Sequence, residues 1–133
     1  MALERLSDEA IQRISGPSWE PLKQTFLDMS EVLLDVATES VGVLTTIYVK
    51  YQLTGNPSSG VFAVAWLKTS KQLVVGMSLP DNFESPLLGP APTGTKYKGL
   101  TKYFTLKPGD SVPEQLSQWA SAAYQHALAD TKP

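Results

Sequence analysis

Apolar residues recur every three or four positions in three stretches of the chain, which is the pattern of amphipathic helices. The longest stretch predicts a helix over residues 18–38, with an apolar stripe made of Leu22, Phe26, Met29, Leu33 and Val36. A short helix is predicted before it, over residues 3–15. A last helix is predicted over residues 112–129, because Ser111 and Glu114 have the spacing of a capping box just ahead of a further apolar stripe.

Between these helices the period of the pattern changes to two, which is typical of strands. Residues 41–53 alternate strictly, so we expect one strand whose odd-numbered side chains share a face. Strands over residues 61–68 and 72–79 follow after turn-forming residues, and residues 41–79 are therefore predicted to form a three-stranded antiparallel meander. Residues 100–107 alternate again and predict a fourth strand.

The segment between the last two predicted strands, residues 80–99, is rich in proline and glycine and has little periodicity. A connection of that length without secondary structure is uncommon in a compact domain and is usually functional or mobile. Helices and antiparallel strands in this order predict an α+β, two-layer fold. The expected sheet has about four strands, with the N-terminal and C-terminal helices packed on one face.

The chain has 133 residues, of which 42% are hydrophobic and none is cysteine. This length fits a single domain, residues 1–133, that folds without a metal or a disulfide. The lack of cysteine excludes disulfides, cysteine-ligated zinc, iron–sulfur clusters and a thiol nucleophile. No stretch reaches the ~18–20 apolar residues of a membrane span, and no signal peptide is recognisable. We therefore expect a cytoplasmic protein without a membrane partner.

The formal net charge of -2 hides an asymmetry along the chain. Residues 1–39 carry eight acidic and three basic side chains, a charge of -5, whereas residues 40–133 carry eight lysines and five acidic side chains, a charge of +3. Such a difference can indicate a face that binds polyanions. The simpler interpretation is that an acidic helical layer lies beside a more basic sheet layer of the same fold.

Four segments together carry a resemblance to a known family: Val61 to Trp66, Leu73 to Pro80, Lys102 to Leu106, and a helix ending in Ala122 to Ala127. In this order they resemble an uncharacterised bacterial domain family often labelled "predicted transport protein", and more distantly the YjbR-like proteins. The resemblance covers roughly residues 20–129. It supports the predicted fold, and because members have no established activity it carries no catalytic residue across.

The residue types that usually carry chemistry are sparse. His126 is the only histidine, and no motif supplies the partners that a catalytic or metal-binding histidine needs, so we expect it to be packed at the boundary of the core. The glycine-rich segment before Lys96 is not a phosphate-binding loop, since Thr95 separates Gly94 from the lysine and nearby prolines remove backbone donors. No catalytic, metal-binding or cofactor-binding residue, and no cofactor, is predicted.

Lysines alternate with aromatic residues from Lys96 to Tyr103, a pattern that can hold phosphates while rings stack on bases. The same residues also suit an edge strand that lysines protect from aggregation, with Lys102 among inward-facing apolar residues near that edge. The acidic isoelectric point favours the edge strand over nucleic-acid binding.

The strand over residues 61–68 is apolar on both faces, so the sheet face without helices needs a cover. The long loop, a partner subunit or a ligand are the three alternatives. The residues expected to form a candidate ligand or partner surface are Tyr48, Phe62, Trp66, Lys98, Lys102 and Tyr103.

Three functional hypotheses follow. The first is a non-enzymatic binding or interaction module that forms a homodimer through a sheet or helix surface. The second is a small-molecule-binding protein or enzyme with a cleft between the 80–99 loop and the sheet. The third, which we weigh lowest, is a weak nucleic-acid binder that uses the segment from Lys96 to Lys107.

Overall fold

A computed structural model of the protein describes residues 2–54, 60–69, 71–80, 82–83, 85–91, 95, 97 and 100–130. Five strands form one antiparallel sheet in the order β1-β2-β3-β4-β5. The strands are β1 (Ser40–Thr45), β2 (Tyr48–Leu53), β3 (Val61–Thr69), β4 (Gln72–Met77) and β5 (Lys102–Leu106). The predicted α+β class is confirmed, with one strand more than expected.

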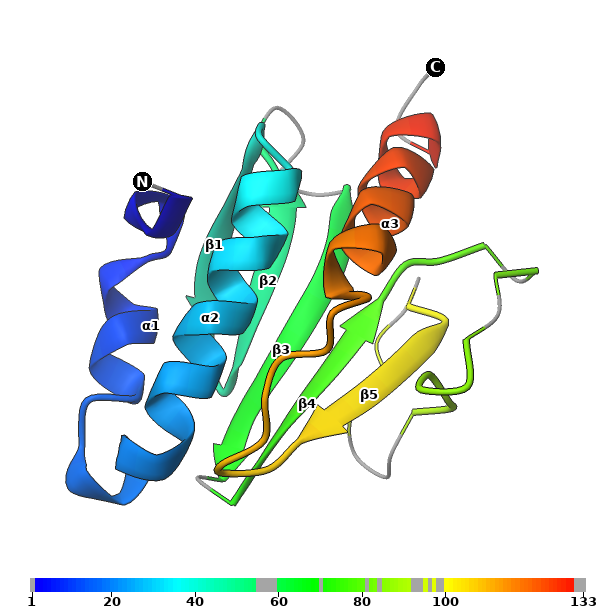
Figure 1. Ribbon diagram of the computed structural model, residues 1–133. Coiled ribbons are helices and arrows are strands. Elements are labelled where there is room, and N and C mark those ends of the chain that lie inside the picture. Colours follow the sequence, from blue (N-terminus) through cyan, green and yellow to red (C-terminus); the bar gives the residue numbers. More distant parts are fainter. Residues whose placement is uncertain are drawn as a thin grey trace.

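Helices cover one face of this sheet (Figure 1). α2 and α3 lie side by side over the sheet, and the N-terminal helices lie beside α2 and β1. The helices are η1 (Ala2–Arg5), α1 (Asp8–Arg13), η2 (Pro17–Trp19), α2 (Glu20–Val36) and α3 (Leu116–Asp130). The stripe predicted on α2 is confirmed in its first four members, which are fully buried: Leu22, Phe26, Met29 and Leu33. No helix in the described parts of the chain is long and apolar enough to cross a membrane.

Two of the predicted helices have different bounds in the structure. The helix expected over residues 3–15 is divided into η1 and α1, because Leu6 between them pairs with Gly42 of β1. The helix expected over residues 112–129 begins only at Leu116. The chain ahead of it is still crossing from β5 to the helical layer, where the Asp110 carbonyl accepts a hydrogen bond from Thr25 Oγ1 at 3.2 Å.

The single strand predicted over residues 41–53 is wrong. A two-residue turn at Thr46 and Ile47 divides it into β1 and β2, with Thr45 paired to Tyr48. Thr46 has φ 56°, a left-handed conformation that β-branched residues rarely adopt. Two-residue turns usually have glycine or asparagine at such a position, so the sequence gives no signal for this turn. Because the chain reverses there, Val49 is in the core between sheet and helices, whereas Val43 on β1 faces away from it.

A β-bulge corrects the expected position of Phe62. Tyr51 pairs with Ala63 and Gln52 pairs with Val61, so Phe62 is the extra residue on β3. Its ring contacts Tyr51 at 6.5 Å between ring centroids, and Tyr124 of α3 at 6.0 Å. Phe62 therefore belongs to the helix-side core, not to the opposite sheet face on which the sequence pattern placed it.

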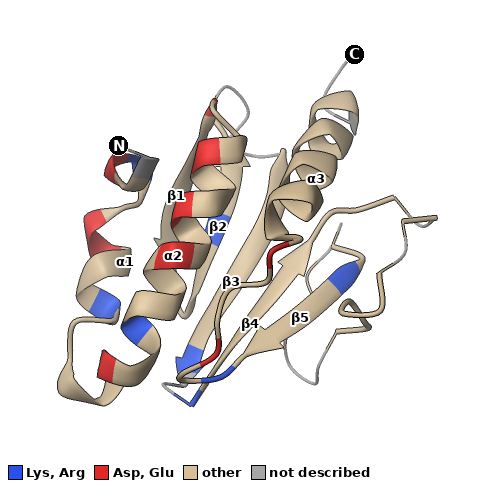
Figure 2. Cartoon of the chain, viewed as in Figure 1, with Lys and Arg blue, Asp and Glu red and all other residues tan. Residues whose placement is uncertain are grey.

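The distribution of charge follows the layers of the fold (Figure 2). Acidic side chains lie along α1 and α2, whereas lysines lie on β2 and β5 and near the strand ends. Exposed carboxylates on α2 include Asp28, Glu31 and Asp35. The charge asymmetry read from the sequence thus corresponds to an acidic helical side and lysines on the sheet.

Candidate functional site

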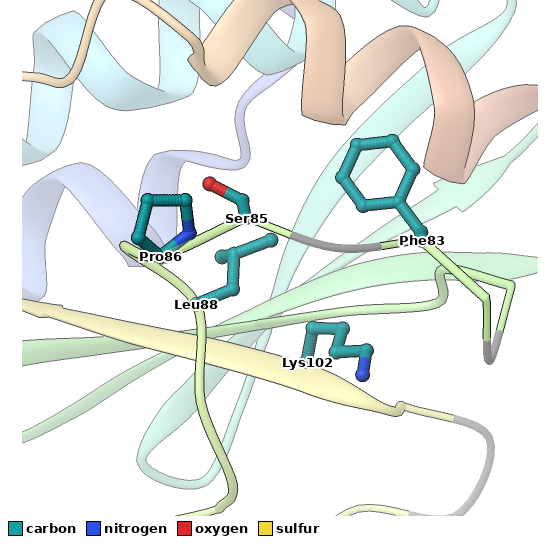
Figure 3. A pocket seen from close by; sticks show the side chains of 5 residues that line it. All are labelled: Phe83, Ser85, Pro86, Leu88 and Lys102. Atoms are coloured by element: carbon teal, nitrogen blue, oxygen red, sulfur yellow. The ribbon is translucent and has the colours of Figure 1, made fainter.

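A cleft lies between the long loop and strand β5, on the side of the sheet that faces the helices. Its volume is about 410 Å³. Figure 3 shows the side chains around it, with Lys102 rising from β5 near Leu88 and Phe83 of the loop. Ser85 and Pro86 are the other described residues of the lining. Among the described residues of this lining, three are apolar and two are polar, the hydroxyl of Ser85 and the ammonium of Lys102.

Hydrogen bonds fasten the loop over β5 at two points. At its start, the Leu79 amide donates to Thr101 Oγ1 at 3.1 Å, and the Thr101 hydroxyl donates to the Leu79 carbonyl at 2.6 Å. Further along, Gly89 and Tyr103 exchange two backbone hydrogen bonds of 2.9 and 2.8 Å. The described residues between Leu79 and Gly89 therefore form an arch over the strand end that carries Lys102 (Figure 3).

Turns inside the arch position its apolar side chains. The Phe83 amide donates to the Pro80 carbonyl at 2.9 Å, and the Leu88 amide donates to the Ser85 carbonyl at 3.1 Å. Both Phe83 and Leu88 pack against the helix-side core while lining the cleft. Their contact with the core gives the cleft a fixed apolar wall.

Lys102 is the charged group among the described residues that line this cleft. It is half-buried, its cross-strand neighbour is the apolar Met77, and none of the described residues forms an ion pair or a hydrogen bond with its ammonium. Withdrawing a cation from water is unfavourable unless an anion compensates for it. The expectation that Lys102 lies among inward-facing apolar residues near a sheet edge is met by this position on β5.

The candidate surface residues predicted from the sequence do not form one surface. Tyr48, Trp66 and Tyr103 do gather on the face of the sheet opposite the helices. Phe62 and Lys102 lie on the helix side instead, because of the bulge at Phe62 and the alternation along β5. Lys98 falls outside the described residues.

The three aromatic residues of the outer face and Tyr97 of the loop form a series of ring contacts. Ring centroids are 6.0 Å apart for Tyr48 and Trp66, 5.8 Å for Tyr48 and Tyr97, and 6.0 Å for Trp66 and Tyr103. Only 5% of Trp66 and 4% of Tyr103 is exposed, and Ala91 and Leu100 help to cover them. Among the three alternatives for a cover, the long loop therefore supplies it over β3 to β5.

Burial changes the acid–base behaviour of this cluster. It raises the pKa of Tyr103 above the ordinary value of 10.0, although the Tyr97 amide donates a hydrogen bond of 3.1 Å to the Tyr103 hydroxyl oxygen and opposes the rise. Burial, assisted by the nearby Tyr48, also raises the pKa of Tyr97. Both phenols are neutral at physiological pH, and the enclosed Trp66 and Tyr103 rings are not available to stack on bases.

His126 lies at the boundary of the core, as expected. Its Nδ1 atom is 3.1 Å from both the hydroxyl oxygen and the carbonyl oxygen of Ser78. A protonated Nδ1 donates to the Ser78 carbonyl and an unprotonated Nδ1 accepts from the Ser78 hydroxyl, so the ring nitrogen has a partner at Ser78 in either tautomer. No group of three or more metal-ligating side chains occurs within the described ranges.

Comparison with known proteins adds no relative: no protein-family profile, no curated protein and no solved structure matches this chain. The resemblance noted from the sequence therefore stays a prediction, and the cleft must be interpreted from its own geometry. The sequence pattern indicated a cleft under the 80–99 loop and an inward-facing Lys102. It did not indicate that Phe83 and Leu88 form the wall, because that segment has no periodicity from which orientation can be read.

Proposed function

We propose that the protein is a non-enzymatic binding module that holds a small organic anion in the cleft between residues 83–88 and β5. The observation that carries the proposal is the half-buried ammonium of Lys102, which no described residue pairs, in a hollow whose described lining includes the apolar side chains of Phe83 and Leu88. A volume of about 410 Å³ lies in the range of roughly 300–1,000 Å³ that small-molecule sites occupy. A carboxylate would compensate the charge of Lys102 while an apolar body contacts Phe83 and Leu88.

Calorimetric titration with hexanoate tests this proposal, with hexanol as a neutral ligand of the same length. We expect hexanoate to bind and to raise the melting temperature, because a ligand that binds only the folded state stabilises it. Hexanol should bind at least tenfold more weakly, since it cannot compensate the ammonium.

Two lysine variants make the test specific. Lys102→Met keeps the length of the side chain but removes its charge, and it should lower hexanoate affinity at least tenfold. Lys50→Met is the matched control, because Lys50 is also a half-buried lysine on a strand, β2, but lies outside the cleft. The proposal would be contradicted if both variants lost the same amount of hexanoate affinity, or if the wild type bound hexanoate and hexanol equally well.

A homodimer is a further proposal, and its support is the outer face of β1. Val41 and Val43 are half-buried there and belong to neither of the two hydrophobic clusters. A second copy packed on this face would cover both side chains. Sedimentation equilibrium of the wild type and of Val43→Lys tests it: a dimer that becomes monomeric supports the proposal, and a strict monomer at high concentration contradicts it. The cytoplasmic location also stays a prediction, which cell fractionation can test.

A further inference from the structure

A second hollow lies next to the cleft along the same strand. Its volume is about 270 Å³, and its lining includes Leu87 of the loop, Thr105 of β5 and Asp110. Below these are largely buried apolar side chains: Phe104, Leu106 and Trp119. The second hollow therefore has an apolar floor that belongs to the core itself.

Both hollows are lined by residues on the helix-facing side of β5 and by adjoining residues of the loop, and the second hollow also reaches Thr105 at the strand edge. Lys102 lines the first hollow, and Phe104 and Leu106, two and four positions further along the strand, line the second. Alternate residues of a strand are about 7 Å apart on the same face. Leu88 lines the first hollow, and its neighbour Leu87 lines the second. The hollows are thus consecutive along β5, with a cation at one end and apolar surface beyond it.

Leu87 is unusual in its exposure. It is 51% exposed, the one large hydrophobic side chain classed as exposed in the described part of the chain. An exposed leucine at the rim of an apolar hollow becomes buried if an apolar chain enters, which removes it from water.

We infer that the natural ligand is a single-headed amphiphilic carboxylate whose apolar chain runs along β5, from Lys102 over Phe104 to the surface above Trp119. This inference rests on the proposed function of the cleft. The carboxylate pairs with Lys102, the first carbons lie against Leu88, and the remaining chain covers the floor of the second hollow beneath Leu87. Asp110 at the far end selects against a second negative charge on the ligand.

Chain length is the first test. Affinities of butanoate, hexanoate and octanoate are measured by calorimetry. Each methylene removed from water should strengthen binding, with an upper limit of about fourfold per carbon. Octanedioate should bind at least fivefold more weakly than octanoate because its second carboxylate meets Asp110, and Asp110→Asn should narrow that difference.

Leu87→Ser tests the contribution of the second hollow to binding separately from that of the first. Because Leu87 is exposed, the variant should keep the melting temperature of the wild type and its affinity for butanoate, while octanoate binding weakens at least fivefold. In protein labelled with 5-fluorotryptophan, the Trp119 ¹⁹F resonance should shift with octanoate but not with butanoate. Trp66, enclosed on the opposite face, serves as the internal control.

The outcomes distinguish the two proposals. If neither butanoate nor octanoate binds in a manner that depends on Lys102, both the cleft function and the elongated ligand are wrong. If both bind through Lys102 with equal affinity, and neither Leu87→Ser nor the Trp119 resonance responds to octanoate, the cleft function stands and the elongated ligand is overturned.

Discussion

At the β1 edge of the sheet, backbone and side chains of the N-terminal segment close the strand, whereas at the β5 edge a loop covers the strand only in part. The Ser7 amide donates to the Gly42 carbonyl at 2.8 Å, and Ser7 Oγ accepts from the Leu44 amide at 3.2 Å. At β5, Gly89 forms an isolated bridge with Tyr103. Thr105, two residues further along the strand, is exposed, so the loop does not cover this part of the edge.

The charged groups of the two edges differ in the same way. Arg5 donates to four carbonyls at and beyond the end of α2, those of Leu34, Ala37, Thr38 and Ser40. Lys102 at the other edge is paired by no described residue. Among the described residues, Arg5 at the β1 edge thus has several carbonyl partners, whereas Lys102 at the β5 edge has none. The comparison teaches that the candidate site lies at the sheet edge that the neighbouring segment covers only in part.

The largest effect should come from Arg5→Ala. The substitution removes charge-assisted hydrogen bonds to several carbonyls near the C-terminus of α2, and we expect a loss of about 2–3 kcal/mol in the free energy of unfolding. Arg5→Lys should recover only part of this lost free energy. The lysine keeps the positive charge, but its ammonium cannot reach several carbonyls as the planar guanidinium does. Urea unfolding measures both.

Lys102→Ala is the counterpart at the other edge. With no partner among the described residues to lose, it should change stability by less than about 0.5 kcal/mol. Equal destabilisation by Arg5→Ala and Lys102→Ala would show that the two edges do not differ as argued.

Glycines at the two edges offer the next comparison. A Cβ on Gly42 would lie 2.8 Å from Leu6 Cδ1 and 3.2 Å from Tyr51 Cε1, whereas a Cβ on Gly89 would have no neighbour within 4 Å. Gly42→Ala should therefore cost about 1–2 kcal/mol through overpacking, and Gly89→Ala should be neutral. Thermal unfolding of the two alanine variants decides this, and similar melting temperatures would refute it.

Gly89→Pro should open the β5 edge selectively. Proline removes the amide that donates to the Tyr103 carbonyl at 2.9 Å, and we expect a cost of about 1 kcal/mol. Because the arch over Lys102 is loosened, the free energy of hexanoate binding should decrease by more than the free energy of unfolding does. Gly89→Ala retains the amide and should bind as the wild type does, so equal binding by the alanine and proline variants would count against the arch.

The sequence predicted the layers of the fold better than the details of the sheet. Leu22, Phe26 and Met29 repeat over a long helix, and such a repeat survives local irregularities. The alternation placed Phe62 on the same face as Trp66 and Val43 on the same face as Val49, and both groupings are wrong. A single bulge or an unsignalled two-residue turn reverses the alternation of side chains. The turn at Thr46 depends on tertiary pairing rather than on a local residue preference.

The candidate site was predictable in location but not in composition. A loop of this length and an alternating β5 pattern indicated a cleft and placed Lys102 inward. The role of Arg5 had no sequence signal, because its carbonyl partners lie about 30 residues away along the chain. Long-range pairing of this kind is visible only once the chain is folded.

Tyr103→Phe should have only a small effect at neutral pH, and it tests the face of β5 that points away from the helices. Losing the hydrogen bond from the Tyr97 amide should cost about 0.5 kcal/mol at pH 7. Because the folded protein raises the pKa of Tyr103 above 10.0, the unfolded chain loses this proton first as the pH rises. The contribution of Tyr103 is therefore complete below pH 10 and is lost progressively above it. Urea unfolding between pH 7 and 11 measures this contribution. The free energy of unfolding should fall less steeply with rising pH in Tyr103→Phe than in the wild type. If it falls equally in both proteins, the alkaline loss of stability does not come from Tyr103.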